Sequence, residues 1–321
     1  MKKLWTRHAA FALAGAAALA LASCGGKGKA DGSWLRENDV HVAVDNTFEP
    51  VMAEMAQTFG MAHIEAKMKP LYLCEDSAIR LLVDDSVRCC VATRMLTPQE
   101  KKVIASHDQL TANQSLIATD AIALVVNKAN ADTLITLDEI RGIVSGRITR
   151  WEQLARHARK GELRLVFDNS RSSTVRFMRD SLCGGRQLDG NVYASEGGTN
   201  PSVLDAVRSD PDAIGVVGAN WLMGDSHTAL SDFSGLDVNV VRVSRVAGDG
   251  AKYVRPYQYY IATGDYPLWR SVYIIHTDPR SQSMLRSFYF FVKGQKGQTI
   301  ICNSSQMLPN SPVQVKAVNV N

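Results

Sequence analysis

Hydroxyl side chains occupy three turns of the chain at which a strand is expected to end and a helix to begin. These side chains are Thr47, Ser77 and the run 172–174. The first turn of a helix exposes unpaired N–H groups and a partial positive charge, and hydroxyls add further donors. In open α/β sheets such turns gather at the carboxyl ends of the strands, where ligands bind. Each hydroxyl alone is also typical of a helix cap, but together they predict a site for a small oxyanion.

Two arginines stand close to these turns in the sequence. Arg171 lies inside the third turn, and Arg94 follows the strand expected over 87–92. A guanidinium group can hold an oxyanion through two parallel hydrogen bonds. Both arginines are therefore candidates for the charged part of the site.

Strands and helices alternate along the chain, and they must position these groups. Apolar runs with the period or length of strands are followed by helical patterns, and two capping boxes, Thr97 with Glu100 and Thr136 with Glu139, mark helix starts. Ser77 is expected to cap the second helix. The strands are expected over residues 40–44, 87–92, 118–126, 163–167 and 213–217, and the segment 253–275 is aromatic and β-prone. The pattern predicts an α/β protein with largely parallel sheets.

The first residues have the pattern of an export signal. Basic residues precede an uncharged run from Ala9 to Ala22, which is too short to span a membrane. The run ends in Leu-Ala-Ser-Cys-Gly, which resembles the bacterial lipobox, so residues 1–23 are expected to be a signal peptide and Cys24 the lipidated mature N-terminus. Residues 24–35 then form a flexible tether. An ordinary signal peptide with an incidental Cys is the alternative.

The chain length indicates the number of domains, and the net charge excludes one class of ligand. A chain of 321 residues suggests two domains. Removal of residues 1–23 leaves 33 Lys and Arg against 32 Asp and Glu, a net charge of +1, which is no footprint for nucleic acid. An anion must therefore be held by a local site.

Five cysteines remain after Cys24. An odd number in an oxidising compartment leaves at least one thiol unpaired, and no C-x-x-C motif indicates zinc or redox chemistry. Adjacent Cys89 and Cys90 point to opposite faces of their expected strand and are typical of small buried apolar residues. The pairing stays open among Cys74, Cys89, Cys90, Cys183 and Cys302.

Four segments resemble, in order, the phosphate-binding proteins of ABC importers, which are type 2 periplasmic binding proteins. The first joins Leu134–Ile140 to Gly146–Trp151 and is similar to the family's L-T-L-x-x-I…G-x-I-T-x-W stretch. The others are similar to its A-I-G-Y strand, its Y-P-L-x-R crossover and its G-Q-x-I-I end, and they are Asp212–Val217, Gly264–Arg270 and Gly297–Ile301. The resemblance covers about residues 38–315.

The resemblance implies which residues bind phosphate. Thr47 and Phe48 match the first ligand loop, Ser77 the second, and the third loop, D-G-S-G-T in the family, lies over 169–173. The third loop has Ser at both Gly positions and lacks the Arg that often precedes it, so Arg171 is expected to supply the guanidinium from a shifted position. The implied ligands are Thr47, Phe48, Ser77, Arg94, Arg171, Ser172, Ser173 and Thr174.

Arg94 bears on which oxyanion is bound. It stands where some members of the family have an Asp that accepts a proton of phosphate, and a guanidinium cannot accept one. Sulfate carries no proton, so without another acceptor the selectivity against sulfate is expected to be weaker. Alternatively, Arg94 and Arg171 together clamp a more highly charged oxyanion. The remaining candidate acceptors are Asp45, Glu75, Asp76 and Asp168.

The function that follows from the resemblance is capture of inorganic phosphate and its delivery to the transmembrane permease of an ABC importer. The protein is expected to be an extracytoplasmic, lipid-anchored monomer without metal or cofactor. One lobe is expected from 36–117 with 268–321 and the other from 118–267, joined by a two-strand hinge. The alternatives are a lipid-anchored sensor or scaffold with altered or lost ligand, and a binding protein for another oxyanion such as sulfate. A hydrolase is the rival class, but Ser172 or Ser173 would need a general base, and no HExxH, GxSxG or Walker motif occurs.

Overall fold

The computed structural model describes residues 2–3, 38–222 and 233–313. Most of the expected signal peptide, the tether with Cys24, and residues 314–321 lie outside the described residues.

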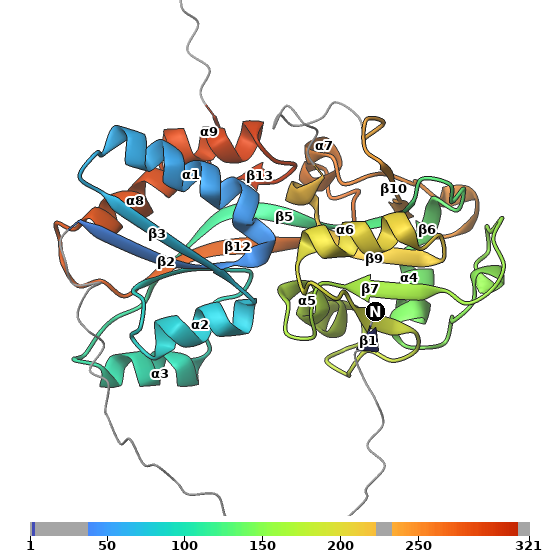
Figure 1. The fold of residues 1–321 in the computed structure, drawn as a ribbon, viewed down its shortest axis with the longest axis horizontal. Coiled ribbons are helices and arrows are strands. Elements are labelled where there is room, and N and C mark those ends of the chain that lie inside the picture. The colour runs from blue at the N-terminus through green and yellow to red at the C-terminus, as the bar shows by residue number, and fades with distance from the viewer. Residues whose placement is uncertain (1, 4–37, 223–232, 314–321) are drawn as a thin grey trace, which may run out of the picture.

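Helices and strands alternate over most of the described chain (Figure 1). The strands are β1 (Lys2–Lys3), β2 (Asp39–Asp45), β3 (Lys67–Leu73), β4 (Cys89–Ala92), β5 (Asn113–Asn127), β6 (Leu134–Thr136), β7 (Arg164–Phe167), β8 (Val192–Ala194), β9 (Ala213–Gly218), β10 (Val238–Val240), β11 (Arg242–Ser244), β12 (Trp269–His276) and β13 (Leu308–Pro309). The α-helices are α1 (Glu49–Ala62), α2 (Glu75–Val83), α3 (Pro98–Ser106), α4 (Leu137–Val144), α5 (Ser173–Leu182), α6 (Asn200–Ser209), α7 (Gln258–Ala262), α8 (Met284–Lys293) and α9 (Gln295–Asn303). Short 3-10 turns are η2 (Asn46–Phe48), η3 (Trp151–Gln153), η4 (Ala219–Trp221) and η5 (Gly248–Gly250).

One long sheet runs through the molecule. Different groups of helices pack on its two halves, which form two lobes. The strand order is β1-β8-β7-β9-β5-β12-β4-β2-β3, with β10 and β13 paired to β5 beside this path and β6 paired to β11 separately. β2 runs parallel to β3 and β4, and β7 runs parallel to β8 and β9. We call residues 38–117 together with the described residues from 268 onward lobe I, and the described residues from 118 to 267 lobe II; β1 pairs with β8 at the edge of lobe II.

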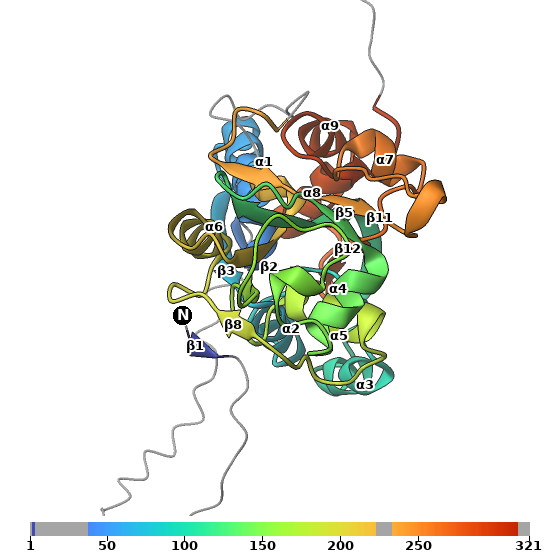
Figure 2. The ribbon, with the colours of Figure 1, turned by 90° about the vertical axis from the view of Figure 1, so that its right-hand side faces the viewer.

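Lobe I has a helical layer on each face of its sheet. The period of two along β2 sends Val40, Val42 and Val44 into a core with α1, α8 and α9, and sends Ala43 to the opposite face with α2 and α3. Figure 2 shows the same sandwich end-on, with α1, α8 and α9 above the strands and α2 and α3 below them. Both faces of β2 are therefore buried, which fits its apolar sequence.

Lobe II has its own core around β5, β7 and β9. Their apolar side chains pack against α4, α5 and α6, and Trp151 from η3 is fully enclosed among them. The two lobes thus have separate hydrophobic cores.

Two antiparallel strands connect these cores (Figure 1). β5 is 15 residues long, and it pairs with β12 over 113–121 and with β9 over 122–126. In lobe I, β12 also pairs with β4 in antiparallel orientation. A β-bulge lies between Val272 and Tyr273, where the register of β12 against β5 shifts. This arrangement brings the loops after β2 and β4 opposite the N-terminus of α5.

The expected fold class is confirmed, and so are both capping boxes, at Thr97 and Thr136. The expected cap at Ser77 is wrong, because α2 begins earlier, at Glu75, with Cys74 in the cap position. The segment 253–275 is not β-structure throughout, since α7 precedes β12.

The cysteines outside the lipobox are all free thiols among the described residues. Cys89 and Cys90 lie in the two different cores of lobe I, on opposite faces of β4 as expected. Burial raises the pKa of the Cys89 thiol to about 12, so this residue behaves as an inert core side chain.

Candidate oxyanion site between the two lobes

Two of the predicted hydroxyls meet where the lobes touch. Thr47 lies in η2, directly after β2 of lobe I, and Ser173 is the first residue of α5 in lobe II. Their Oγ atoms are 3.3 Å apart, and both side chains are fully buried. Segments 126 residues apart in sequence therefore contribute to one polar cluster.

Arg270, on the connecting strand β12, binds the hydroxyl of Ser173. Its Nη1 donates to Ser173 Oγ at 2.8 Å, and its Nε donates to Asp120 Oδ2 at 2.9 Å. Asp120 is the residue directly opposite on β5. Arg270 Nη2 and Asp120 Oδ1 are buried and have no partner among the described residues. A desolvated guanidinium N–H that lacks an acceptor is a donor for an anion.

Asp45 places a carboxyl group in the same cluster. It ends β2, and its Oδ1 accepts from the Thr47 N–H at 3.1 Å, while its Oδ2 is buried without a partner among the described residues. Burial, followed by the negative charge of Glu75, raises the pKa of Asp45 to about 7. The charge of Arg270 and the nearby Ser173 hydroxyl oppose this rise of the pKa. Near neutral pH this group can therefore accept or supply a proton.

The end of β9 completes the contact from lobe II. Trp221 Nε1 donates across the junction to the Thr47 carbonyl at 2.8 Å. Gly218 packs so closely that a Cβ there would collide with Thr47 Cγ2. The side-chain amide of Asn220 is fully buried, and neither its oxygen nor its nitrogen has a partner among the described residues. This amide is a further donor and acceptor beside Thr47.

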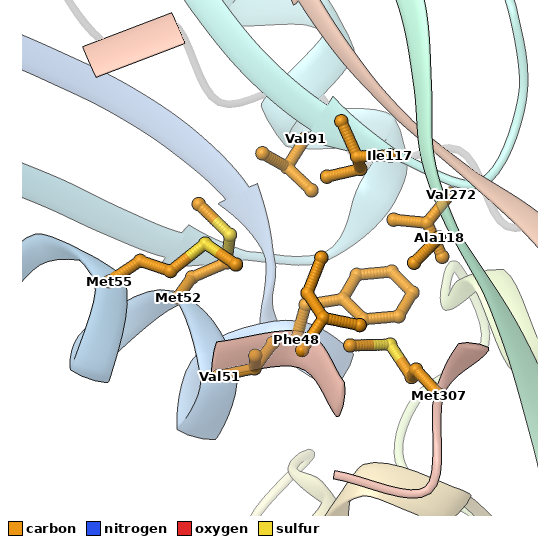
Figure 3. A pocket seen from close by; sticks show the side chains of 10 residues that line it. Phe48, Val51, Met52, Met55, Val91, Ile117, Ala118, Val272 and Met307 are labelled. Carbon is orange, nitrogen blue, oxygen red and sulfur yellow. The ribbon is translucent and has the colours of Figure 1, made fainter. Parts of the chain in front are cut away.

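Phe48 has a different environment from Thr47. Its side chain lines an apolar pocket of lobe I together with Met52, Met55 and Met307 (Figure 3). The Arg270 guanidinium lies over this ring, 5.3 Å from its centre. Phe48 therefore packs between the apolar core of lobe I and Arg270, and it anchors the loop that carries Thr47.

Ser172 and Thr174 are buried beside Ser173 but bind within their own loop. Ser172 caps α5, since its Oγ accepts from the Val175 N–H at 3.3 Å. Thr174 Oγ1 donates to Asp168 Oδ1 at 3.0 Å and lies 2.8 Å from Ser172 Oγ. Burial raises the pKa of Asp168, and the hydroxyls of Ser172 and Thr174 oppose the rise. These groups hold the loop in shape around Ser173.

Both predicted arginine ligands are placed elsewhere, which corrects the sequence interpretation. Arg171 is exposed, because the turn that buries residues 172–174 leaves the preceding residue on the surface. Arg94 donates two hydrogen bonds to Glu100, at 2.8 and 2.7 Å, in the capping box of α3. The cation that contacts Ser173 is Arg270 instead.

Ser77 also lies apart from the Thr47–Ser173 cluster in its contacts. It is half-buried, with its Oγ 3.1 Å from Cys74 Sγ. The cap of α2 lies at Cys74, three residues before the predicted cap, so Ser77 falls inside the first turn of the helix and Glu75 is its first residue. Glu75 binds Thr93 of its own lobe and Arg176 of lobe II.

Sequence reasoning missed Arg270 as a member of the buried cluster, although a signal for it exists. Arg270 and Asp120 each stand alone as a charge in an apolar, β-prone segment. Single opposite charges in two such strands indicate a buried ion pair between them, because an isolated buried charge is costly.

Two further features of the described residues bear on ligands and membranes. No group of three or more His, Cys, Asp or Glu among residues 2–3, 38–222 and 233–313 could hold a metal ion. Over the same residues, no helix combines the length and the apolar character needed to cross a bilayer.

Comparison with protein families identifies the group to which this fold and site belong. A family model described as the PBP superfamily domain matches residues 26–293. The chain belongs to the PBP superfamily. Members of this superfamily of periplasmic binding proteins are binding receptors, which agrees with the expectation that the chain is not an enzyme.

Individual relatives agree with the resemblance noted in the sequence. The chain is 25% identical over 199 residues to the phosphate-binding protein PstS of Bacillus subtilis, which covers 62% of this chain and 58% of that protein. The match therefore spans less than two thirds of the relative's length. The resemblance to phosphate-binding proteins is confirmed.

Solved structures show the same superfamily fold. One is assigned as a phosphate ABC transporter substrate-binding protein from Clostridium perfringens and contains bound phosphate. It superposes with a TM-score of 0.68 at 19% identity, over 85% of this chain and all of that chain. An ABC-type phosphate transport receptor from Vibrio cholerae superposes with a TM-score of 0.60 at 19% identity, over 82% and 96% of the two chains.

Proposed function

We propose that this protein captures inorganic phosphate between its two lobes and delivers it to the transmembrane permease of an ABC importer. The observation that carries the proposal is the buried Arg270 guanidinium, which holds Ser173 with one nitrogen and leaves another without an acceptor among the described residues. The hydroxyls of Thr47 and Ser173 reach the same point from different lobes. Membership of a binding-protein superfamily and the named phosphate-binding relatives add support.

The chemistry of the cluster fits a tetrahedral oxyanion that carries a proton. Arg270 and the two hydroxyls supply donors for oxygen atoms that have lost their water, and low local polarity strengthens each of these bonds. Asp45 Oδ2 supplies an acceptor for the proton. When it is ionised, Asp45 takes the role that the Arg94 position cannot, and sulfate, which has no proton, would then face a carboxylate to which it can donate nothing. β5 and β12 would bend as the hinge on release.

Ser173→Ala tests the capture site directly. The variant loses one hydrogen-bond donor to the anion, so phosphate affinity is expected to fall by about 2- to 12-fold, which corresponds to about 0.5–1.5 kcal/mol. The measurement is calorimetric titration of the full chain with phosphate, arsenate and sulfate.

The matched control is Ser170→Ala, because Ser170 lies in the same loop but is exposed. It is expected to bind like the unaltered protein. Both the unaltered protein and this control should bind phosphate and arsenate, and both should bind sulfate much more weakly. If none of the three anions binds, the proposal is wrong and the sensor or scaffold interpretation takes its place.

The proposal includes an extracytoplasmic position on a bacterial membrane, with acyl chains on Cys24 as the anchor and a monomer as the working unit. The basis is the lipobox-like sequence behind a short apolar run. Cys24→Ala removes the acylation site, so the protein is expected to move from the membrane fraction to the soluble fraction with unchanged phosphate affinity. Fractionation followed by immunoblotting measures this, and continued membrane retention would contradict the anchor.

A further inference from the structure

A second contact joins the lobes, and it is built around the carboxylate of Glu75. Glu75 opens α2 of lobe I and is 1% exposed. The N–H and hydroxyl of Thr93, in the loop after β4, each donate to Oε1 at 2.6 Å. Arg176, on α5 of lobe II, donates from Nε to Oε2 at 2.6 Å and from Nη2 to Oε1 at 3.2 Å. Figure 1 shows α2 and α5 facing each other from the two lobes.

The surroundings of this carboxylate have the chemistry of a bound oxyanion. A backbone N–H, a hydroxyl and a guanidinium from different elements hold two negatively charged oxygens, as an anion site does. Arg176 Nη2 also donates to Thr93 Oγ1, so the donors form a connected set. The anion that they hold belongs to the chain itself.

This carboxylate lies close to the Thr47–Ser173 cluster. Arg176 is one helical turn after Ser173 on α5, and the charge of Glu75 acts on Asp45. A negative group at this place repels an incoming anion, and it also neutralises the positive charge of Arg176 that would otherwise attract one.

We propose that Glu75 is a resident anion of the interlobe site, which holds the lobes together without ligand and lowers the affinity of the site for added phosphate. The affinity part rests on the proposed function, whereas the interlobe contact part does not. The resident carboxylate makes phosphate capture a competition, so that the protein binds more weakly than its other donors would allow.

Glu75 remains ionised in this environment. Burial disfavours its charge, but Arg176 and the hydrogen bonds from Thr93 outweigh that cost, and the pKa of Glu75 lies below its ordinary value. The carboxylate is therefore a permanent charge at neutral pH.

Glu75→Gln tests both parts. The amide has the same shape but no charge, so phosphate affinity is expected to rise at least about tenfold, because Arg176 regains its uncompensated charge. Without phosphate, the segments that contain Thr93 and Arg176 should exchange their amide hydrogens faster than in the unaltered protein. Calorimetry and hydrogen exchange followed by mass spectrometry on the full chain give these two results.

Asp76→Asn is the matched control, since Asp76 is the next residue of the same helical turn and is exposed. It is expected to change neither phosphate affinity nor exchange. Glu75→Asp keeps the charge but shortens the reach, so it should speed exchange without raising affinity. This second variant separates loss of the contact from loss of the charge.

The outcomes distinguish this proposal from the proposed function. If the unaltered protein and Glu75→Gln both fail to bind phosphate, the proposed function fails, and hydrogen exchange alone decides the interlobe contact. If phosphate binds but Glu75→Gln binds no more tightly, the resident-anion role is wrong. If exchange near Thr93 and Arg176 is equal in all variants, Glu75 does not hold the lobes together.

Discussion

Arg270→Ala is expected to reduce phosphate affinity by about 10- to 100-fold. A hydrogen bond from a charged donor to a desolvated anion contributes about 1.5–3 kcal/mol, and Arg270 is the guanidinium that contacts Ser173. The same change leaves Asp120 buried opposite an empty position, which should lower the free energy of unfolding by about 3–5 kcal/mol. Calorimetry and urea denaturation measure the two effects.

A second variant separates the loss of binding from the loss of stability. Arg270→Gln combined with Asp120→Asn keeps a polar pair between β12 and β5 but removes both charges, so stability should largely return while phosphate affinity stays low.

Arg171→Ala should bind phosphate like the unaltered protein, because Arg171 is exposed. If the folded Arg270→Ala protein binds phosphate normally, or if Arg171→Ala loses tenfold, the assignment of the cation is wrong.

The fold could be predicted from sequence because its signals are local. Apolar runs with sharp ends mark β2, β7 and β9, and reciprocal capping boxes mark the starts of α3 and α4. Each signal depends on residues within a few positions of one another, so no knowledge of the tertiary structure is needed. β3 escaped because its pattern, Lys-Met-Lys-Pro-Leu-Tyr-Leu, includes a Pro and alternates exposed with half-buried residues at the edge of the sheet.

The site could be predicted only where its residues belong to such local patterns. Thr47 and Ser173 stand at strand-to-helix turns, and the structure brings them together. Arg270 lies 97 residues from Ser173, and its role depends on the antiparallel register of β12 against β5, which no local pattern contains. Strand register and strand partners are tertiary properties, so the sequence patterns could not predict site residues such as Arg270 that come from distant segments.

Two of the misplaced residues, Arg94 and Ser77, share one cause, which is that short-range bonds compete for a polar side chain. Arg94 lies six residues from Glu100 and binds it twice. Ser77 lies beside Cys74, three residues away on the same turn. A local partner costs less conformational entropy than a distant ligand, so a polar residue near a capping box or a helix start is more often part of that local structure.

Asp45→Asn is expected to change how stability depends on pH. In the folded protein Asp45 holds its proton up to about pH 7, whereas in the unfolded chain it ionises near the ordinary pKa of 3.8. Between these values the unfolded state binds fewer protons, so the free energy of unfolding falls as the pH rises, by on the order of 4 kcal/mol in total. Asparagine does not titrate, so the variant should gain stability relative to the unaltered protein between pH 4 and pH 8. Urea denaturation across this range measures the difference.

The control is again Asp76→Asn, whose exposed side chain should leave the pH profile of stability as it is in the unaltered protein.

The sign of the stability change in Asp45→Asn distinguishes two descriptions of Asp45. A carboxylate held ionised by Arg270 would have a lowered pKa, and its replacement would cost most stability at high pH. A carboxyl group kept neutral by burial and by Glu75 gives the opposite trend, because its charge is what the fold opposes. Parallel profiles for Asp45→Asn and the unaltered protein would show that folding does not raise the pKa of Asp45, and they would contradict the neutral carboxyl group.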